Sequence, residues 1–339
     1  MVRTQGADDE EHQAILACLE RCNAPGAEDG KRRHLTRAND LYRYTPEVSA
    51  LGPNPKPQEL WSRGCGQGRT LMDKTLKDFC RGRQRAYGHF VVEFATPGIG
   101  HILKEAGCDF VLFDTEHSGF GFETIKSAMR YFEAARLPAI VRVPSKAYDQ
   151  VARAADMGAE AIMVPMVDNA AEAQELVSHL KYTPIGRRGV ALGVAHDAYR
   201  GGPVAEKLAG ANERTCLFAQ IETASGVEQA DEIAAVDGVD CLWVGHFDLS
   251  ASLSIPGQFE HPTFLTAIDR VAEACERHGK ALGRLVPDSA TGVDYAARGF
   301  DFLCWSGDVW ALQAAVQAGI NAMRDGIAAR EAALLQRRA

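Results

Sequence analysis

The sequence predicts a (β/α)8 barrel, and three observations carry that prediction. From about residue 87 onward, apolar runs rich in Val, Ile, Leu and Phe alternate with amphipathic helical segments. Such strands are typical of a parallel sheet covered by helices. Eight repeats in roughly 220 residues fit a closed barrel better than an open doubly wound sheet. Finally, charged side chains gather where several of the runs end, as expected for the active face of a barrel.

The expected strands are the eight apolar runs His89–Ala95, Phe110–Asp114, Ala139–Val143, Ala161–Val167, Leu217–Ile221, Cys241–Val244, Ala281–Val286 and Phe300–Trp305. The expected helices between them are Ile99–Ala106, Glu123–Ala135, Tyr148–Met157, Ala170–Leu180, Gly226–Ala235, Pro262–His278 and Asp288–Arg298. A final helical stretch from about Trp310 to Leu335 is longer than one strand needs. It is either a frayed tail or a helix that packs on, or exchanges with, another subunit.

Three regions follow from this pattern. Residues 1–85 form an N-terminal extension, partly helical or disordered, because charge clusters, a Pro-rich stretch and several glycines interrupt any long periodicity. Within it, helices are expected near residues 9–22 and over Thr70–Arg81. Residues 86–325 form the barrel, and residues 326–339 a C-terminal helical tail.

Composition bounds the class of protein. With 46% hydrophobic and 24% charged residues, the chain reads as an ordinary soluble globular protein. The net charge of −8 argues against nucleic acid or an anionic membrane as the main partner. We expect a cytoplasmic protein, since no secretory h-region or membrane-spanning run is evident. The nine cysteines show no Cys-x-x-Cys pair, and Cys216, Cys241 and Cys304 read as small buried hydrophobes in a reducing compartment.

Two acidic residues follow neighbouring apolar runs and suggest a metal site. Glu222 and Asp248 are 248 − 222 = 26 positions apart, about one strand-helix unit. Their carboxylates suit Mg2+ or Mn2+, although His246 keeps Zn2+ open. At strand period two, Gln220 points to the same side as Glu222. The alternative for either acid alone is that it caps the following helix.

Other polar residues at strand ends suggest the remaining chemistry. His117 lies three positions after Asp114, and a carboxylate that orients an imidazole is a usual form of general base. Arg142 ends an apolar run, where its guanidinium needs an anion such as a substrate carboxylate or enolate. No apolar run contains a lysine, and Lys146 falls in a loop. A Schiff-base mechanism therefore lacks a nucleophile, and metal activation of a ketone is the natural substitute.

Five segments in this order resemble the HpcH/HpaI family of metal-dependent class II pyruvate aldolases. They are Asp114-Thr115-Glu116-His117, Val141-Arg142, Val164-Pro165-Met166-Val167, Gln220-Ile221-Glu222-Thr223 and Gly245-His246-Phe247-Asp248-Leu249-Ser250. The resemblance covers about residues 70–325. It departs from the family at His246-Phe247, where many members have a Pro-Ala pair, and in the length of the N-terminal extension.

The resemblance implies roles for individual residues. Glu222 and Asp248 correspond to the metal ligands, for Mg2+ or alternatively Mn2+, Co2+ or Zn2+. Arg142 corresponds to the residue that contacts the keto oxygen, and Gln220 to one that positions water or substrate. His117 and Asp114 correspond to the base dyad.

Further positions also match the family. The amides around Phe247 and Asp248 correspond to a carboxylate site. Asp156 corresponds to an acid that reaches a neighbouring subunit's site, and the Arg187-Arg188-Gly189 loop is a further candidate for lining the site. The resemblance also implies a homo-oligomer, a hexamer built as a trimer of dimers, with the last helix exchanged.

The expected function is a carbon–carbon lyase that acts through a pyruvate enolate on a 2-oxo acid and an aldehyde. Decarboxylation of oxaloacetate, or addition of the same enolate to an acceptor as in the fungal member macrophomate synthase, is the alternative within the enzyme class. A lyase for CoA thioesters is a third option, with Arg187-Arg188 and Lys31-Arg32-Arg33 as candidate phosphate contacts. From another class, the barrel could be an inactive binding module.

Overall fold

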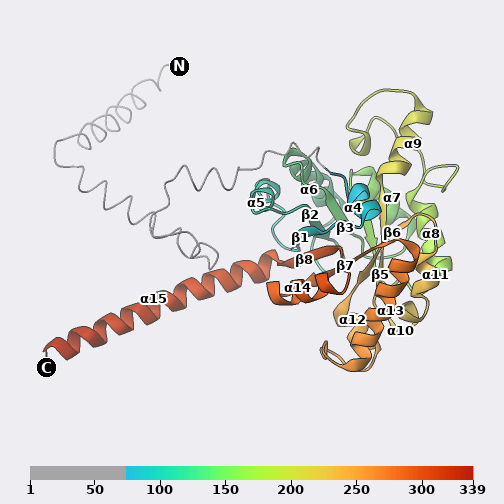
Figure 1. Cartoon of the computed structure of the whole chain (residues 1–339). Helices are drawn as coiled ribbons and strands as arrows, with labels where there is room; N and C mark the ends of the chain where they lie inside the picture. The colour runs from blue at the N-terminus through green and yellow to red at the C-terminus, as the bar shows by residue number, and fades with distance from the viewer. Residues whose placement is uncertain (1–73, 339) are drawn as a thin grey trace, which may run out of the picture. The chain divides into compact units, whose positions relative to one another are not determined.

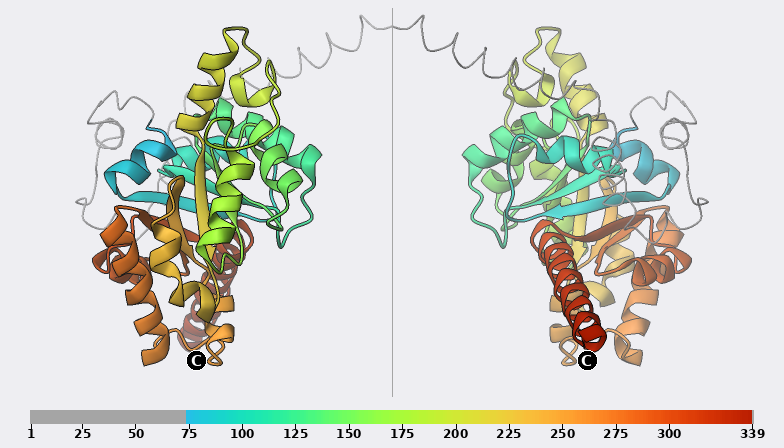
Figure 2. Two further views of the ribbon diagram at one scale, coloured as in Figure 1. Left: turned by 90° about the vertical axis from the view of Figure 1, so that its right-hand side faces the viewer. Right: turned by 90° about the vertical axis from the view of Figure 1, so that its left-hand side faces the viewer.

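A computed structural model describes residues 74–338 of the chain. The strands of this part form one closed barrel in the order β1-β2-β3-β4-β5-β6-β7-β8. Neighbouring strands are parallel, and β8 pairs with β1 to close the ring. Figures 1 and 2 show the strands at the centre with helices around them. The predicted (β/α)8 barrel is thus confirmed.

The strands lie within two residues of the predicted starts, except β1, which begins three residues earlier. They are β1 (Ala86–Val91), β2 (Phe110–Asp114), β3 (Ala139–Arg142), β4 (Ala161–Val164), β5 (Cys216–Ile221), β6 (Val239–Val244), β7 (Ala281–Val286) and β8 (Phe302–Gly307). The helices between them are α5 (Ile99–Glu105), α6 (Phe122–Ala134), α7 (Tyr148–Asp156), α8 (Ala170–Leu180), η2 (Ala195–Asp197), α9 (Val204–Arg214), α10 (Ala224–Glu228), α11 (Ala230–Ala234), α12 (His246–Ser252), α13 (Pro262–His278) and α14 (Ser289–Ala297).

Side chains of alternating strand positions separate into two apolar clusters. One fills the barrel and includes Phe110, Phe218, Trp243 and Phe302. The other lies between the strands and the surrounding helices. The interior is packed tightly enough that a Cβ at Gly283 would lie 2.4 Å from the Trp243 ring. The barrel is therefore a filled core rather than a pore, and only the strand ends are available for a site.

Helix α4 (Leu76–Gly82) closes the amino-terminal end of the barrel. Thr75 and Asp78 form a capping box that starts this helix. Its residues Leu76, Phe79 and Cys80 are buried and belong to the interior cluster. The helix predicted over Thr70–Arg81 thus begins at Leu76 in the described chain. The helix predicted near residues 9–22 lies outside the described residues.

Some elements differ from the prediction. The helix expected over Gly226–Ala235 is divided into α10 and α11, because the Gln229 backbone leaves the helical range with ψ of 9°. Helix α9 had no strong apolar signal, since only Ala211 and Asn212 of it are buried. Cys216, Cys241 and Cys304 are buried free thiols, as predicted.

The final helix, α15 (Asp308–Arg338), starts against the barrel and then leaves it. The Asp308 carboxylate accepts backbone hydrogen bonds from Val92, Glu93 and Phe94, and the Trp310 ring stacks on Phe90. Residues 312–337 of the helix are exposed, and Figure 1 shows it projecting from the barrel. In the described part of the chain, no helix is long and apolar enough to cross a membrane.

Candidate active site

Four polar side chains reach the carboxyl end of the barrel because of strand parity. Phe110 and Leu112 point into the barrel, so Asp114 at the end of β2 does so as well. The same alternation carries Arg142 inward after Ile140 on β3, and Gln220 and Glu222 inward after Phe218 on β5. Asp114 and Arg142 are direct register partners. The structure therefore brings these predicted residues to one mouth.

Glu222 is buried and held on both sides. Gln220 Nε2 donates to Glu222 Oε1 at 2.6 Å, and the Met166 N–H donates to Glu222 Oε2 at 2.9 Å. Met166 has a φ of 56°, a left-handed conformation that non-glycine residues rarely adopt. The segment after β4 thus bends so that its amide faces the carboxylate. Each Glu222 oxygen keeps a lone pair for another partner.

Gly245, between β6 and α12, lets Glu222 approach the next strand. A Cβ at this position would lie 2.2 Å from Glu222 Oε1 and 2.8 Å from Gln220 Nε2. Three residues later, Asp248 lies in the exposed first turn of α12. Asp248 raises the pKa of Glu222 electrostatically. The predicted pair of acids therefore lies at the same edge of the barrel.

The pKa of Glu222 is raised to about 7. Burial is the main cause, and the nearby carboxylates of Glu116 and Asp248 add to it, while the Met166 amide and Arg142 oppose it. Burial disfavours the charged form of a carboxyl group, and so does a neighbouring negative charge. Among these charged neighbours of Glu222, two are negative and only Arg142 is positive, so negative charge is in excess around this carboxyl group.

Arg142 is fixed by two carboxylates. Its Nε donates to Asp114 Oδ1 at 2.7 Å, and its Nη1 lies 3.2 Å from Glu116 Oε2. Its guanidinium also lies over the Phe90 ring, 5.3 Å from the centroid. An arginine held in this way presents its remaining N–H groups in a fixed direction. It is preorganised to meet an anion at the mouth.

In this structure, Asp114 accepts from donors other than the His117 ring. The Asp114 oxygens instead accept from the backbone N–H groups of Glu116 and His117, each at 3.1 Å, and from Arg142. The His117 ring is about two-thirds exposed, and its Nε2 lies 3.8 Å from Glu116 Oε2. A carboxylate three residues ahead of a turn caps the local backbone more readily than it reaches a side chain beyond it.

Glu116 is the site residue that the sequence interpretation missed. Burial raises the pKa of its carboxyl group against the opposing effect of Arg142. Its Oε2 is buried without a hydrogen bond from the described residues, although Arg142 lies near it. Glu116 lies in the turn after β2, where strand parity no longer fixes the direction of a side chain, so the sequence held little signal for it.

A profile of the HpcH/HpaI aldolase/citrate lyase family matches residues 89–315. The chain belongs to the HpcH/HpaI aldolase/citrate lyase family. It is 36% identical over 228 residues to a hydroxypyruvate/pyruvate aldolase of Chromohalobacter salexigens, covering 67% of this chain and 89% of that one. It is therefore an enzyme of the carbon–carbon lyase class, as predicted, rather than an inactive module.

Solved structures agree with this membership. An HpcH/HpaI aldolase from Desulfitobacterium hafniense superposes with a TM-score of 0.70 at 33% identity, covering 74% of this chain and 96% of that one. Macrophomate synthase superposes with a TM-score of 0.65 at 25% identity, covering 74% and 90%. The family in general depends on divalent metals.

The donor set at the mouth of this HpcH/HpaI enzyme fits a hard divalent cation. Asp114, Glu116, Glu222 and Asp248 bring four carboxylates to the same region as Arg142. Gln220 Oε1 is buried without a partner in the described part of the chain. Oxygen ligands with excess negative charge favour Mg2+ or Mn2+. Among residues 74–338, no group of three or more His, Cys, Asp or Glu could hold a metal ion, so a cation here would be held by fewer than three of these carboxylates.

His246 and Phe247, which depart from the family pattern, behave differently from each other. His246 is buried against Phe247 and Phe259, with ring centroids 4.5 and 5.1 Å apart. Burial and the positive charge of Arg284 lower its pKa to about 3. Phe247 is 63% exposed. His246 is thus packed as a neutral aromatic residue, whereas the Phe247 ring remains accessible beside Asp248.

Asp156 and the Arg187-Arg188-Gly189 loop form a separate cluster. Asp156 ends α7 shortly before β4, so it lies away from the mouth of its own barrel. Its carboxylate pairs with the buried Arg188, whose Nε lies 3.1 Å from Asp156 Oδ1. Arg187 contacts Glu175 and His179. The structure therefore does not bring these residues to the mouth within one subunit.

None of the eight strands of the described barrel contains a lysine, as predicted. Lys146 Nζ pairs with Glu172 at 2.6 Å. Lys181 is buried and its pKa is lowered to about 8, mainly by burial. Its ammonium group donates to Asn212 O, Thr215 O and Thr215 Oγ1. Because these acceptors occupy its three donors, Lys181 has a structural role.

Proposed function

We propose that this protein is a divalent-metal-dependent aldolase that cleaves or forms 4-hydroxy-2-oxo acids through the enolate of pyruvate, with an aldehyde as the second product or substrate. One observation carries the proposal: Glu222 and Asp248 lie at the same barrel mouth as a preorganised Arg142. The name of the Chromohalobacter relative, a hydroxypyruvate/pyruvate aldolase, supports the choice of a 2-oxo acid.

Glu222 and Asp248 would hold the cation, with Mg2+ or Mn2+ preferred and Co2+ or Zn2+ as substitutes. When bound, a divalent cation supplies Lewis-acid polarisation of the keto group of a 2-oxo acid. Gln220 offers an unpaired Oε1 to position water or substrate. The first amides of α12, at Phe247 and Asp248, receive the substrate carboxylate, because N–H groups in a first helical turn have no intrahelical acceptor.

Arg142 contacts the keto oxygen and stabilises the negative charge that develops there during cleavage. Asp114 and Glu116 orient this guanidinium before substrate arrives. Such preorganisation matters because donors that already point at the developing charge need not reorganise during the reaction.

His117 accepts the proton of the 4-hydroxyl group in the cleavage direction. The C3–C4 bond then breaks, the aldehyde carbonyl forms at C4, and the bonding electrons go to the pyruvate enolate, which takes up a proton at C3. The Glu116 carboxylate lies 3.8 Å from His117 Nε2 and would stabilise the imidazolium. Asp156 acts at a neighbouring subunit's site.

Decarboxylation of oxaloacetate is the second candidate, because loss of CO2 yields the same enolate. The structural similarity to macrophomate synthase supports decarboxylation as this second candidate. CO2 release from oxaloacetate, followed with and without an aldehyde acceptor, distinguishes the two candidates.

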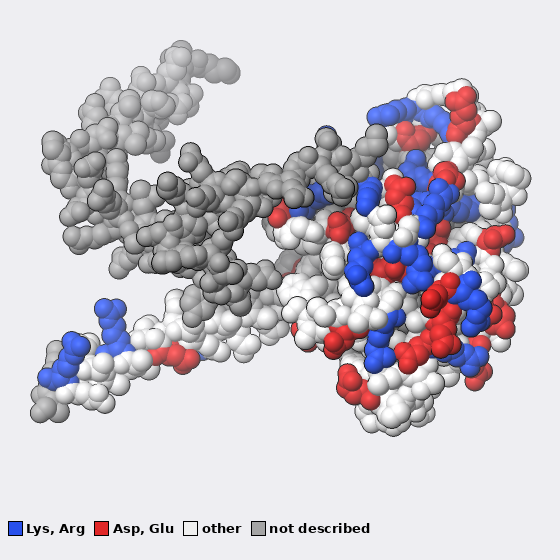
Figure 3. Space-filling view, in the orientation of Figure 1, with Lys and Arg blue, Asp and Glu red and all other residues white. Residues whose placement is uncertain are grey.

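The helix α15 supports a homo-oligomer, which we propose is a hexamer arranged as a trimer of dimers with α15 exchanged. Residues 309–323 contain no Asp, Glu, Lys or Arg, and Figure 3 shows this half of the helix without charge. Val316, Ile320, Met323 and Ile327 are exposed at spacings of three or four residues. Tyr87 on β1 and Trp305 on β8 are 53% and 46% exposed. A partner's α15 would cover the apolar face of this helix and the two exposed aromatic rings.

A cytoplasmic location stays a prediction.

The direct test is pyruvate release from a panel of 4-hydroxy-2-oxo acids, coupled to lactate dehydrogenase and NADH. We expect activity that disappears with EDTA and returns with Mg2+, Mn2+, Co2+ or Zn2+ to different extents. Activity that persists after exhaustive chelation would exclude the metal-dependent mechanism. Absence of pyruvate release together with CO2 release from oxaloacetate would favour the second candidate.

A further inference from the structure

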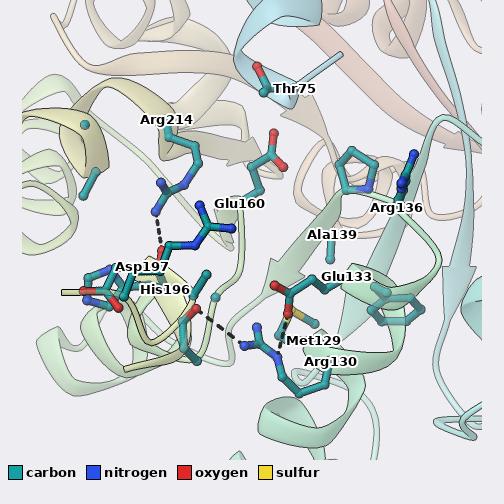
Figure 4. Close-up of a pocket in the computed structure, with 18 of the residues that line it drawn as sticks. Thr75, Met129, Arg130, Glu133, Arg136, Ala139, Glu160, His196, Asp197 and Arg214 are labelled. Atoms are coloured by element: carbon teal, nitrogen blue, oxygen red, sulfur yellow. Dashed lines mark hydrogen bonds and ion pairs between the residues drawn. The ribbon is translucent and has the colours of Figure 1, made fainter. Parts of the chain in front are cut away.

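A second, basic pocket opens at the amino-terminal end of the barrel, opposite the candidate active site. Its volume is about 630 Å3. Its wall includes Leu137 to Ala139 at the start of β3, Gly158 and Glu160 before β4, and Arg214 before β5. The rest comes from the end of α6, the η2 turn and α9. Figure 4 shows side chains from these segments around one opening.

The pocket is positively charged in a chain that is negatively charged overall. Six basic residues line it, against three acidic ones. The basic residues are Lys74, Arg130, Arg136, Arg200, Lys207 and Arg214, and the acidic residues are Glu133, Glu160 and Asp197. The whole chain carries −8. A local excess of cations in a concave site concentrates anions.

Backbone carbonyl oxygens help to hold two of the arginines. Arg130 donates from Nη1 to Ala195 O at 3.5 Å and from Nη2 to Met157 O at 3.3 Å. Arg214 Nη2 donates to His196 O at 2.5 Å. Carbonyl oxygens fix a guanidinium in place without cancelling its charge. These cations are therefore positioned but only partly neutralised.

The acids of the pocket compensate this charge incompletely. Glu133 lies 3.1 Å from Arg130 Nε, but at an angle that leaves Nε without a hydrogen bond. Asp197 is engaged by Lys207 at 2.7 Å. Burial raises the pKa of Glu160, while the Leu76 N–H that donates to its carboxylate and the charge of Arg214 oppose this shift.

Polar atoms without partners also mark this pocket. Arg130 Nε, His196 Nδ1 and Asp197 Oδ1 are buried and have no hydrogen-bond partner within residues 74–338. Buried polar atoms in proteins are normally satisfied. Three such atoms lie on residues that line one pocket, and Arg130 Nε among them has the Glu133 carboxylate 3.1 Å away.

We propose that this basic pocket binds a small anion that carries two or more negative charges on oxygen, either a phosphate ester or a polycarboxylate. Guanidinium groups pair with phosphoryl and carboxylate oxygens in forked geometry, and the volume admits a metabolite rather than a single ion. Met129, Phe132 and Leu137 give the pocket an apolar wall beside the cations. The site is independent of the proposed aldolase chemistry, because none of its residues lies at the barrel mouth.

The test is isothermal titration calorimetry of the full-length protein with inorganic pyrophosphate and, separately, citrate. The protein is first stripped of metal with EDTA and then dialysed into EDTA-free buffer, because EDTA is itself a polycarboxylate that could compete for the pocket. We expect at least one anion to bind, with affinity that falls as salt rises. Binding of pyrophosphate alone assigns the phosphoryl class, and binding of citrate alone assigns the carboxylate class.

Arg200→Glu is the diagnostic variant, because Arg200 is exposed and its side chain has no partner within the described part of the chain. Lys104→Glu on α5 changes the net charge equally, but Lys104 does not line the pocket. We expect Arg200→Glu to raise Kd at least about fivefold, since it replaces an attraction by a repulsion near the anion, and Lys104→Glu to leave Kd unchanged. The proposal is overturned if neither anion binds, if Arg200→Glu binds like the wild type, or if both variants weaken binding equally.

Discussion

Glu222→Gln tests the central electrostatic feature of the mouth. The substitution keeps the shape of the side chain but removes its charge. In the metal-free protein the pKa of Glu222 is raised from 4.5 to about 7, and a shift of this size corresponds to about 3 kcal/mol. A carboxyl group with a raised pKa favours the folded state when protonated. The free energy of unfolding therefore falls as pH rises from about 4.5 to 7.

Glutamine removes this titration. Gln220 can rotate its amide to offer the unpaired Oε1 to the new side chain, so the hydrogen bond at this position is retained. Metal-free Glu222→Gln should then be more stable than the wild type at pH 8 by about 2 to 3 kcal/mol. For a domain of this size, that corresponds to a rise in melting temperature of about 4 to 10 °C.

The assay is thermal unfolding between pH 5 and 8 in EDTA, repeated with saturating Mn2+. The wild type should lose stability with rising pH in EDTA and regain it with Mn2+, whereas the variant should respond weakly to both. Wild-type Mn2+ affinity should also fall below pH 7, because the proton competes for Glu222. Glu232→Gln, an exposed residue on α11, is the control and should match the wild type. Equal pH slopes for Glu222→Gln and wild type, or equal Mn2+ affinity, would refute the reasoning.

Three further predictions test other parts of the site and assembly. Arg142→Lys should lower kcat/KM for pyruvate release at least about 100-fold, because lysine cannot keep the contacts to Asp114 and Glu116 while it faces substrate; an unchanged kcat/KM would remove Arg142 from the mechanism. Gly245→Ala should weaken metal binding and cost about 1 to 3 kcal/mol, since its Cβ would meet Glu222 Oε1 at 2.2 Å. The control Gly292→Ala, with its nearest neighbour at 3.5 Å, should be tolerated, and equal melting temperatures for the two variants would contradict the steric argument. Ile320→Glu should shift light-scattering mass in size-exclusion chromatography to smaller species, whereas Gln317→Glu on the same helix should not; a mass unaffected by Ile320→Glu would count against assembly through α15.

Strand order and parity could be predicted from the sequence because they depend on local chemistry. An apolar run forms a buried strand, and alternation with period two sets which side each residue faces. Arg142, Gln220 and Glu222 therefore reach the mouth as predicted. Asp248 could be placed beside them because consecutive strands of a barrel are neighbours.

The same reasoning does not extend to His117 and Glu116, because both lie in the turn beyond β2. There the partner of Asp114 was decided by competition between backbone amides, an imidazole and a guanidinium from the next strand. The basic pocket was equally hidden. Its cations come from α6, α9 and the η2 region, which share no sequence pattern.

By itself, the sequence determined the barrel and the direction of the side chains at its strand ends, since both depend on residues that are close in the chain. Only the tertiary structure decided that Glu116 completes the mouth, that Gly245 makes room for Glu222, and that cations from distant helices surround one pocket. These contacts depend on how loops and helices pack across the barrel, where distances between atoms rather than spacing along the chain determine which groups meet.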